Sequence, residues 1–253
     1  MFFKIMYFLC VAAEFYAVPT FLKHYWPQRC KKSFIWKTVA ATLFVLTGFF
    51  AMKASGNNTL YADMIMWGLV FGLMGDLFLH ALSQKMILLV AGVIAFLTGH
   101  IFYIVGIHKA IKTTYPDAAV FAWYELLAIA VVVVLVLCVM IFGKLIKTDQ
   151  PLILVGLSAY LVFLTSMLVK AFSFVIGEWA YGMNDHMVII ALTVALGALL
   201  FFISDLTMGL LMLNKERFET QKMRWINIGT YFSAQILLAS SIFFVQSFEI
   251  FGR

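Results

Sequence analysis

Eight long apolar segments constrain the fold of this chain more than any other feature. They cover residues 4–22, 35–53, 60–80, 86–108, 119–142, 151–172, 187–212 and 225–248. A helix needs about 20 predominantly apolar residues to cross the hydrocarbon core of a membrane. The chain is 64% hydrophobic and 12% charged, whereas soluble domains average about 25% charged residues. The sequence therefore predicts an all-α, polytopic membrane helical bundle of about eight transmembrane helices, with residues 1–253 forming a single integral membrane domain.

Basic residues are distributed unevenly between the two sets of loops. Twelve of the 18 Lys and Arg residues are assigned to the loops after the first, third, fifth and seventh segments: Lys23, Arg29, Lys31, Lys32, Lys37, Lys85, Lys144, Lys147, Lys215, Arg217, Lys222 and Arg224. The other six are assigned to the opposite side: Lys4, Lys53, Lys109, Lys112, Lys170 and Arg253. Cytoplasmic loops carry the excess of Lys and Arg, so both termini are predicted to be non-cytoplasmic.

This topology accounts for the net charge of +6 without nucleic acid. The expected partner is the lipid bilayer, either a bacterial cytoplasmic membrane or, in a eukaryote, the endoplasmic reticulum. Three scattered cysteines form neither a metal motif nor a disulfide framework, and no cofactor is expected. The sequence does not indicate an oligomeric state.

Acidic residues inside the apolar segments are the strongest functional signal. Asp76 lies in the third segment, Asp205 in the seventh and Glu14 in the first. A charged residue at the centre of a membrane helix costs about 2.5–3.5 kcal/mol on insertion scales, and such residues usually mark functional sites. Asp76 and Asp205 both lie toward the ends predicted to be cytoplasmic, so we expect them to share a site. Glu14 either pairs with a polar group of the bundle or serves as a third acid of that site.

Small and polar residues accompany the two aspartates. Gly68, Gly72 and Gly75 share a helix face beside Asp76, because positions three or four apart are neighbours on a helix. Such small residues allow close helix packing in lipid, and this is the role expected for Gly68 and Gly72. The other polar positions come from the fourth, seventh and eighth segments: His100, Tyr103, Ser204, Asn227, Tyr231 and Gln235. We therefore predict a polar cavity inside the bundle.

Four motifs occur in a fixed order along the chain. They are Gly68-Leu-Val-Phe-Gly-Leu-Met-Gly75-Asp76-Leu-Phe-Leu79, Phe96-Leu-Thr-Gly99-His100-Ile-Phe-Tyr103, Gly197-Ala198-Leu-Leu-Phe-Phe-Ile-Ser204-Asp205 and Tyr231-Phe-Ser-Ala234-Gln235. With these motifs the chain resembles the YhhN/TMEM86 family of membrane lysoplasmalogenases. The resemblance extends from about Ser33 to Phe244.

This resemblance implies hydrolysis of the vinyl ether bond of a lysoplasmalogen. The products would be a fatty aldehyde and glycerophosphoethanolamine or glycerophosphocholine. Such a bond is cleaved by protonating the alkene carbon, after which water adds to the oxocarbenium ion. Burial and a neighbouring carboxylate both favour the protonated form of a carboxyl, so one of two buried carboxyls can act as the acid. We expect Asp76 and Asp205 to form this acid–base pair, with the assignment of acid and base left open.

The remaining polar residues are expected to bind or position the substrate. His100 and Tyr103 would orient water, Lys37 would face the head group, and the others would line the cavity: Asn227, Tyr231, Gln235 and Ser204, with Glu14 as a further candidate. By residue count, His100 lies ~21 Å from the start of its helix, whereas Asp76 lies ~8 Å from its loop. Either the fourth helix is strongly tilted, or His100 lines a deeper part of the cavity.

Two other classes of function remain open. A metal-dependent lipid hydrolase would use Asp76, His80, His100 and Asp205 as ligands, because aspartate and histidine both bind zinc. A proton-coupled transporter of small solutes or lipids would use the two aspartates as proton carriers. Transporters often have helices broken by Gly or Pro at matched positions of two repeats, and neither feature is evident in this sequence.

Overall fold

The computed structural model describes residues 1–26, 30–56, 59–80, 85–146, 151–182 and 185–244, and within these ranges it contains helices and no strands. The helices are α1 (Phe2–Tyr25), α2 (Lys31–Ser55), α3 (Leu60–His80), α4 (Met86–Thr114), α5 (Trp123–Phe142), α6 (Pro151–Gly177), α7 (Asp185–Leu213), α8 (Lys215–Phe218) and α9 (Gln221–Phe244). A π-helical turn, η1 (Glu178–Gly182), follows α6. The all-α prediction is confirmed.

Among the described residues, eight helices are long and apolar enough to cross a membrane, namely α1 to α7 and α9. Helices suit this environment because every backbone N–H and C=O is bonded within the segment. The prediction of about eight spans in one helical bundle is confirmed. Residues 245–248 at the end of the last predicted segment lie outside the described residues, as do Arg29 and Lys147.

Several helices differ in extent from the predicted segments, and two of these differences matter for the polar groups of the bundle. The helix predicted over 151–172 continues to Gly177 and then into η1. The helix predicted over 35–53 begins four residues earlier, at Lys31. Its start is fixed by a reciprocal cap, in which Ser33 N donates to Cys30 Sγ and Cys30 N donates to Ser33 Oγ. Lys37 therefore lies inside α2 and not in the preceding loop.

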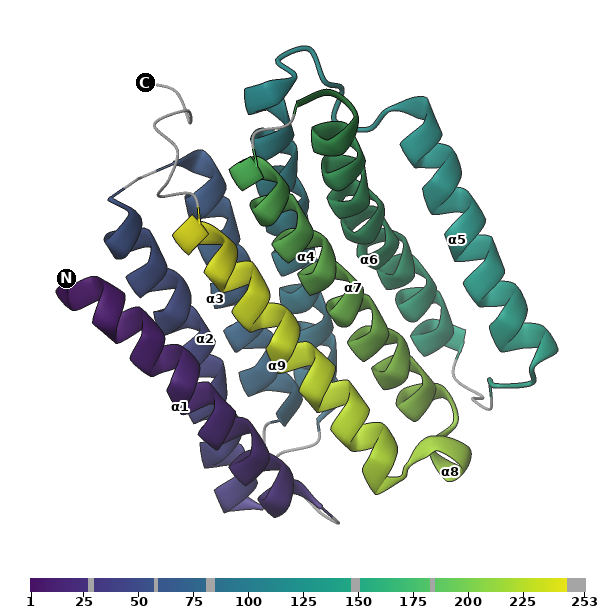
Figure 1. The fold of residues 1–253 in the computed structure, drawn as a ribbon. Coiled ribbons are helices and arrows are strands. Elements are labelled where there is room, and N and C mark those ends of the chain that lie inside the picture. Colours follow the sequence, from purple (N-terminus) through teal and green to yellow (C-terminus); the bar gives the residue numbers. More distant parts are fainter. Residues whose placement is uncertain (27–29, 57–58, 81–84, 147–150, 183–184, 245–253) are drawn as a thin grey trace.

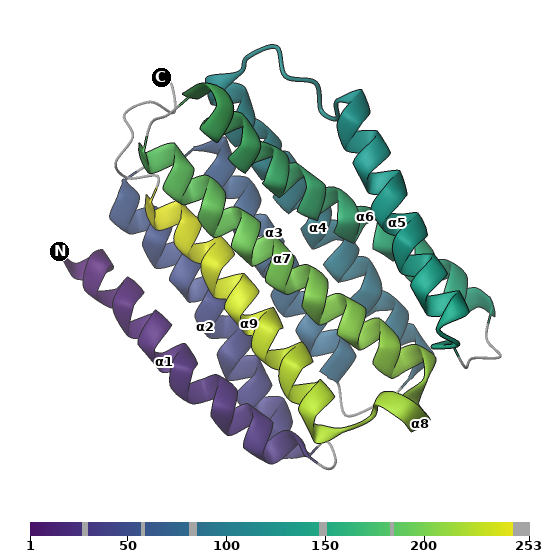
Figure 2. The ribbon, with the colours of Figure 1, turned by 45° about the vertical axis from the view of Figure 1, so that its right-hand side comes forward.

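Helix α9 lies between α1 and α7, and α5 lies at the edge of the bundle (Figures 1 and 2). Helix α9 packs against α7, α2, α3 and α1, whereas α5 packs mainly against α6. In the most apolar stretch of each helix, 61% of the α9 residues are buried and only 11% of the α5 residues. Polar side chains on α9 thus face neighbouring helices, and those on α5 need a partner on α6.

Hydrogen bonds from two tyrosines fix the end of α9 against its neighbours. Tyr7 OH on α1 donates to Ser240 Oγ at 2.8 Å. Tyr61 OH on α3 is hydrogen-bonded to Ser241 Oγ. Because both bonds join buried groups, they fix the position of α9 along its axis relative to α1 and α3.

A buried ion pair connects α5 to α6. Lys170 Nζ donates to the two carboxylate oxygens of Glu125 at 3.1 and 3.0 Å. Both residues are only 2% exposed, and the Lys170 ammonium also lies 5.4 Å from the ring centre of Phe121. Lys170, counted with the basic residues of the non-cytoplasmic side, is therefore buried inside the bundle. A lysine is accommodated inside the bundle because a carboxylate and an aromatic face replace its water.

Removing one partner of this ion pair should destabilise the protein. The Lys170→Met variant leaves the Glu125 carboxylate buried without a cation, and breaking a buried pair in this way costs about 3–5 kcal/mol. We expect a lower midpoint of thermal unfolding in detergent. The double variant Lys170→Met/Glu125→Gln should recover most of the loss, because it buries no charge. The exposed Lys112→Met serves as the control, and a single variant as stable as the wild type would contradict the prediction.

Candidate functional site

A cavity lies between α2, α3, α4, α6, α7 and α9, and we call it the polar cavity. It occupies the half of the bundle next to the loops that follow α1, α3, α5 and α7. Its polar lining consists of Lys37, Asp76, Tyr160, Ser204, Asp205, Asn227 and Tyr231. The structure thus brings Asp76 and Asp205 to one cavity, although they are far apart in the chain.

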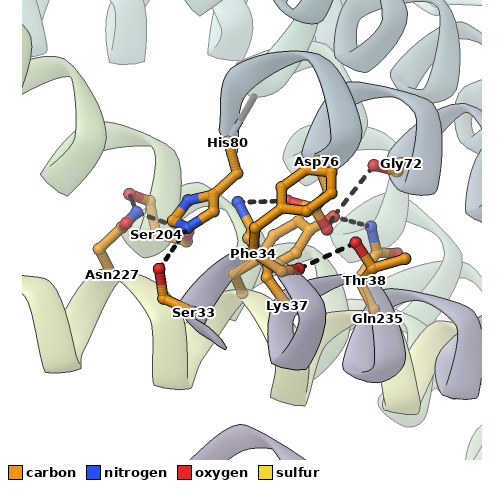
Figure 3. Close-up of polar contacts among 11 residues, drawn as sticks. Ser33, Phe34, Lys37, Thr38, Gly72, Asp76, His80, Ser204, Asn227 and Gln235 are labelled. Carbon is orange, nitrogen blue, oxygen red and sulfur yellow. Dashed lines mark hydrogen bonds and ion pairs between the residues drawn. The ribbon is translucent and has the colours of Figure 1, made fainter. Parts of the chain in front are cut away.

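Asp76 is held by partners on two other helices (Figure 3). Lys37 Nζ of α2 lies 2.8 Å from Asp76 Oδ1, and Tyr231 OH of α9 donates to Asp76 Oδ2 at 2.8 Å. The Asp76 side chain is 2% exposed and that of Lys37 is 12% exposed. Both oxygens of Asp76 are therefore occupied, one by a cation and one by a neutral donor. Lys37, expected at the head group, instead contacts the carboxylate directly.

A chain of hydrogen bonds extends from Asp76 into the core. Gln235 Nε2 donates to Tyr231 OH at 3.1 Å, and Tyr103 OH donates to Gln235 Oε1 at 2.6 Å. All three side chains are buried. Tyr103 and Gln235 are not part of the cavity lining, so they act on the cavity through Tyr231.

Three glycines of α3 make room for the side chains around Asp76. A Cβ atom at any of these positions would lie 2.2–2.7 Å from a side chain of another helix, too close for real Cβ contacts. The pairs are Gly68 with Tyr103, Gly72 with Gln235 and Gly75 with Phe96. The predicted packing role of Gly68 and Gly72 is confirmed.

Asp205 has a different set of neighbours from Asp76. Tyr160 OH of α6 donates a short hydrogen bond to Asp205 Oδ2. The Asp205 side chain is 15% exposed, and His100 Nε2 lies 3.9 Å from Oδ2. In the described part of the chain, no Lys or Arg nitrogen lies within ion-pair distance of Asp205.

The orientation of His100 follows from its other nitrogen. His100 Nδ1 lies 2.8 Å from the carbonyl oxygen of Phe96. A carbonyl accepts only, so Nδ1 carries the proton and, in a neutral imidazole, Nε2 has the lone pair. Among the described residues Nε2 has no hydrogen-bond partner. His100 therefore lies next to Asp205 with an available nitrogen and is absent from the lining of the polar cavity.

Asn227 and Ser204 join α9 to α7 beside Asp205. Asn227 Nδ2 donates to the carbonyl oxygen of Ser204 at 2.9 Å and to its hydroxyl at 3.1 Å. Both residues are buried and line the polar cavity. They stabilise the helix contact that positions Asp205.

His80 is directed away from the two aspartates. Its Nε2 lies 3.2 Å from Ser33 Oγ, and the rings of Phe21, Tyr25 and Phe34 surround the imidazole. Within residues 1–26, 30–56, 59–80, 85–146, 151–182 and 185–244, no three His, Cys, Asp or Glu side chains gather closely enough to hold a metal ion. The ligand set of the metal-dependent alternative is therefore not assembled.

Glu14 remains the least accounted-for acid of the bundle. It is 1% exposed, and neither carboxylate oxygen has a hydrogen-bond partner among the described residues. The expected pairing with a polar group is thus not seen there. Glu14 does not line the polar cavity, although its carboxyl is near enough to Asp76 for an electrostatic interaction.

Sequence reasoning missed Tyr160, which provides the hydrogen bond to Asp205. It lies in the apolar sequence LILVGLSAYLVFLTS of α6, outside all four motifs. The available signal was a tyrosine in a segment otherwise poor in polar side chains, because a buried Tyr hydroxyl usually has a partner.

The fold and the site define a class of protein, namely a polytopic helical membrane protein with two carboxyls in a polar cavity. Residues 32–242 match the YhhN family. The chain belongs to the YhhN family, as the four motifs indicate. The match includes every residue of the cavity lining, whereas Glu14 on α1 lies outside it. No curated protein and no solved structure matches the chain.

Filling the space left by Gly68 should disturb the hydrogen bonds behind Asp76. The Gly68→Ala variant places a methyl group against the buried ring of Tyr103, and overpacking of this kind costs about 1–3 kcal/mol. We expect a lower midpoint of thermal unfolding in detergent. Gly229→Ala on α9 is the matched control, because its Cβ would meet no atom within 4 Å. Equal behaviour of the two variants would show that Tyr103 is not closely packed against α3.

Proposed function

We propose that this protein is a lysoplasmalogenase-type hydrolase, which cleaves the vinyl ether bond of an alkenyl glycerophospholipid that has a single hydrocarbon chain. Membership of the YhhN family is consistent with this activity. The observation that carries the proposal is the contrast between the two carboxyls of the polar cavity. Asp76 contacts a lysine ammonium, and Asp205 contacts a tyrosine hydroxyl and lies near an imidazole. Pairs of titratable groups with opposed environments are typical of acid–base sites.

In this proposal Asp205 is the acid. Its neighbours Tyr160 and His100 bear no fixed positive charge, and a buried carboxyl without a cation favours its neutral form. The protonated Asp205 transfers its proton to the alkene carbon farther from the ether oxygen. The product is an oxocarbenium ion, with the positive charge shared between the adjacent carbon and the ether oxygen.

Asp76 is then the base. The Lys37 ammonium stabilises the carboxylate form of Asp76, and the Tyr231 hydroxyl holds its orientation. The carboxylate faces the oxocarbenium ion and accepts a proton from water as the oxygen of that water bonds to the cationic carbon. General acid–base catalysis of this kind contributes typically about 10²–10⁴-fold.

The hemiacetal then collapses, and both carboxyls return to their initial states. Its hydroxyl proton passes to the Asp205 carboxylate, and the carbon–oxygen bond to the glycerol breaks. The departing oxygen takes the proton held by Asp76. The net reaction consumes one water and releases a fatty aldehyde and the glycerophospho-base.

The basic residues near the mouth of the polar cavity suggest where the head group of the substrate lies. The polar cavity is next to the loops expected in the cytoplasm, so the substrate would come from the cytoplasmic leaflet. In that region Arg224 is bound by both carboxylate oxygens of Glu219 at 2.6 Å, whereas the Lys222 side chain is exposed. Lys222 is thus better suited than Arg224 to contact a phosphate.

Replacing either aspartate should abolish turnover. We expect Asp76→Asn and Asp205→Asn to lower aldehyde release from 1-alkenyl lysophosphatidylethanolamine by ~10²-fold or more, because each variant lacks one of the two proton-transferring groups. The assay uses purified protein in detergent, with no ion gradient. Asp63→Asn is the matched control, since Asp63 is on the same helix but in its first turn.

The same assay distinguishes the alternatives. Loss of activity with a chelator would favour a metal-dependent hydrolase, and unchanged activity would favour the acid–base pair. If well-folded wild-type protein releases no aldehyde, the proposal is wrong. Proton-dependent uptake into liposomes that is abolished by both variants would then favour the transporter.

A further inference from the structure

A second cavity lies between α5, α6 and α7. We call it the apolar cavity, because leucine and methionine side chains form most of its wall. Those contributed by α5 and α6 are Leu137, Met140, Leu154, Leu157, Leu161 and Leu164. On its other side α5 exposes large apolar side chains, including Leu135 and Val139, so this wall separates the cavity from lipid.

The apolar cavity and the polar cavity are adjacent and share part of their walls. Four residues line both of them, namely Leu157, Tyr160, Asp205 and Gly209. The hydrogen-bonded pair of Tyr160 and Asp205 therefore lies at the boundary between an apolar space and a polar one.

Gly209 is the residue at this boundary that leaves space unfilled. It is buried in α7, yet a Cβ atom built on it would have no heavy atom within 4 Å outside its own helix turn. The glycines of α3 are different, because their Cβ positions are occupied by side chains of other helices. Gly209 therefore does not serve close helix packing, and it leaves open space at the boundary of the two cavities.

We propose that the apolar cavity binds the hydrocarbon chain of a single-chain lipid, and that Gly209 is the specificity-determining residue that lets this chain reach Asp205. This inference rests on the proposed function and names the chain-binding part of the same site. A lysolipid has one chain and one polar head group, which correspond to one apolar and one polar cavity.

The position of the boundary also agrees with the chemistry. In an alkenyl lysolipid the vinyl ether joins the hydrocarbon chain to the glycerol, so it lies where the apolar part of the molecule ends. With the chain in the apolar cavity and the head group in the polar cavity, this bond lies beside Asp205. The proton donor of the proposed mechanism is thus next to the alkene carbon.

The inference is tested by closing the passage at Gly209. The Gly209→Phe variant places a ring in the open space, and Gly156→Phe on the exposed face of α6 is the matched control, since its Cβ also meets no atom within 4 Å. Aldehyde release is measured with a long-chain and a four-carbon alkenyl lysophosphatidylethanolamine. We expect Gly209→Phe to lower the rate with the long chain by ~10-fold or more relative to the short chain, as steric discrimination in apolar pockets allows. Gly156→Phe should change neither rate.

A second measurement does not require turnover. A saturated ether lysophospholipid with a diazirine at the end of its chain is photo-crosslinked to the protein, and the labelled peptides are identified by mass spectrometry. We expect labels on α5 and α6 around Leu137 and Leu161 in the wild type and in Gly156→Phe, and their loss in Gly209→Phe.

Two results would overturn the inference. One is that Gly209→Phe affects both chain lengths equally or neither; the other is that the crosslinks lie outside α5, α6 and α7. If the wild type cleaves neither lipid, the proposed function fails, and the crosslinks alone decide whether the apolar cavity binds a chain.

Discussion

The requirement that a buried charge have a partner governs the arrangement of this bundle. Water is absent from the hydrocarbon region, so an ionised side chain there must be paired or must face a cavity. Lys37 and Asp76 meet this requirement between α2 and α3, and Lys170 and Glu125 meet it between α5 and α6. Each pair fixes the rotation of two helices about their axes. The first pair and a second acid without a lysine or arginine partner among the described residues, Asp205, both line the polar cavity.

The contrast between the two carboxyls depends on which helices are neighbours. Asp76 is reached by α2 and α9, which bring Lys37 and Tyr231. Asp205 is reached by α6, which brings Tyr160, and by α4, which brings His100. Different helices thus give the same residue type two electrostatic environments within one cavity.

The sequence was sufficient to predict the eight helices and the shared cavity of Asp76 and Asp205. Long apolar runs can hydrogen-bond their backbone groups in lipid only as helices. Two acids at the same end of such helices avoid lipid by facing the interior of the bundle, where they meet. The partners of the acids could not be predicted in the same way. Lys37 was grouped with the loop cations because it lies near the start of the segment predicted over 35–53, whereas the helical cap at Cys30 starts α2 at Lys31 and places Lys37 well inside the helix. Tyr160 was missed because contact with Asp205 depends on the rotation of α6. The sequence also does not distinguish Gly68, which packs against Tyr103, from Gly209, which leaves an open space.

The hydrogen-bonded chain behind Asp76 has a direction. Tyr103 donates to Gln235, Gln235 donates to Tyr231, and Tyr231 donates to Asp76, so each dipole has its positive end toward the carboxylate. Successive dipoles of this kind polarise one another and strengthen the last bond. The amide of Gln235, however, can relay a proton only by passing through its unfavourable imidic acid tautomer. The chain therefore acts as an electrostatic support and as a proton insulator. Protons and water must reach Asp76 from the cavity side, and this route across the bundle stays closed to proton leakage.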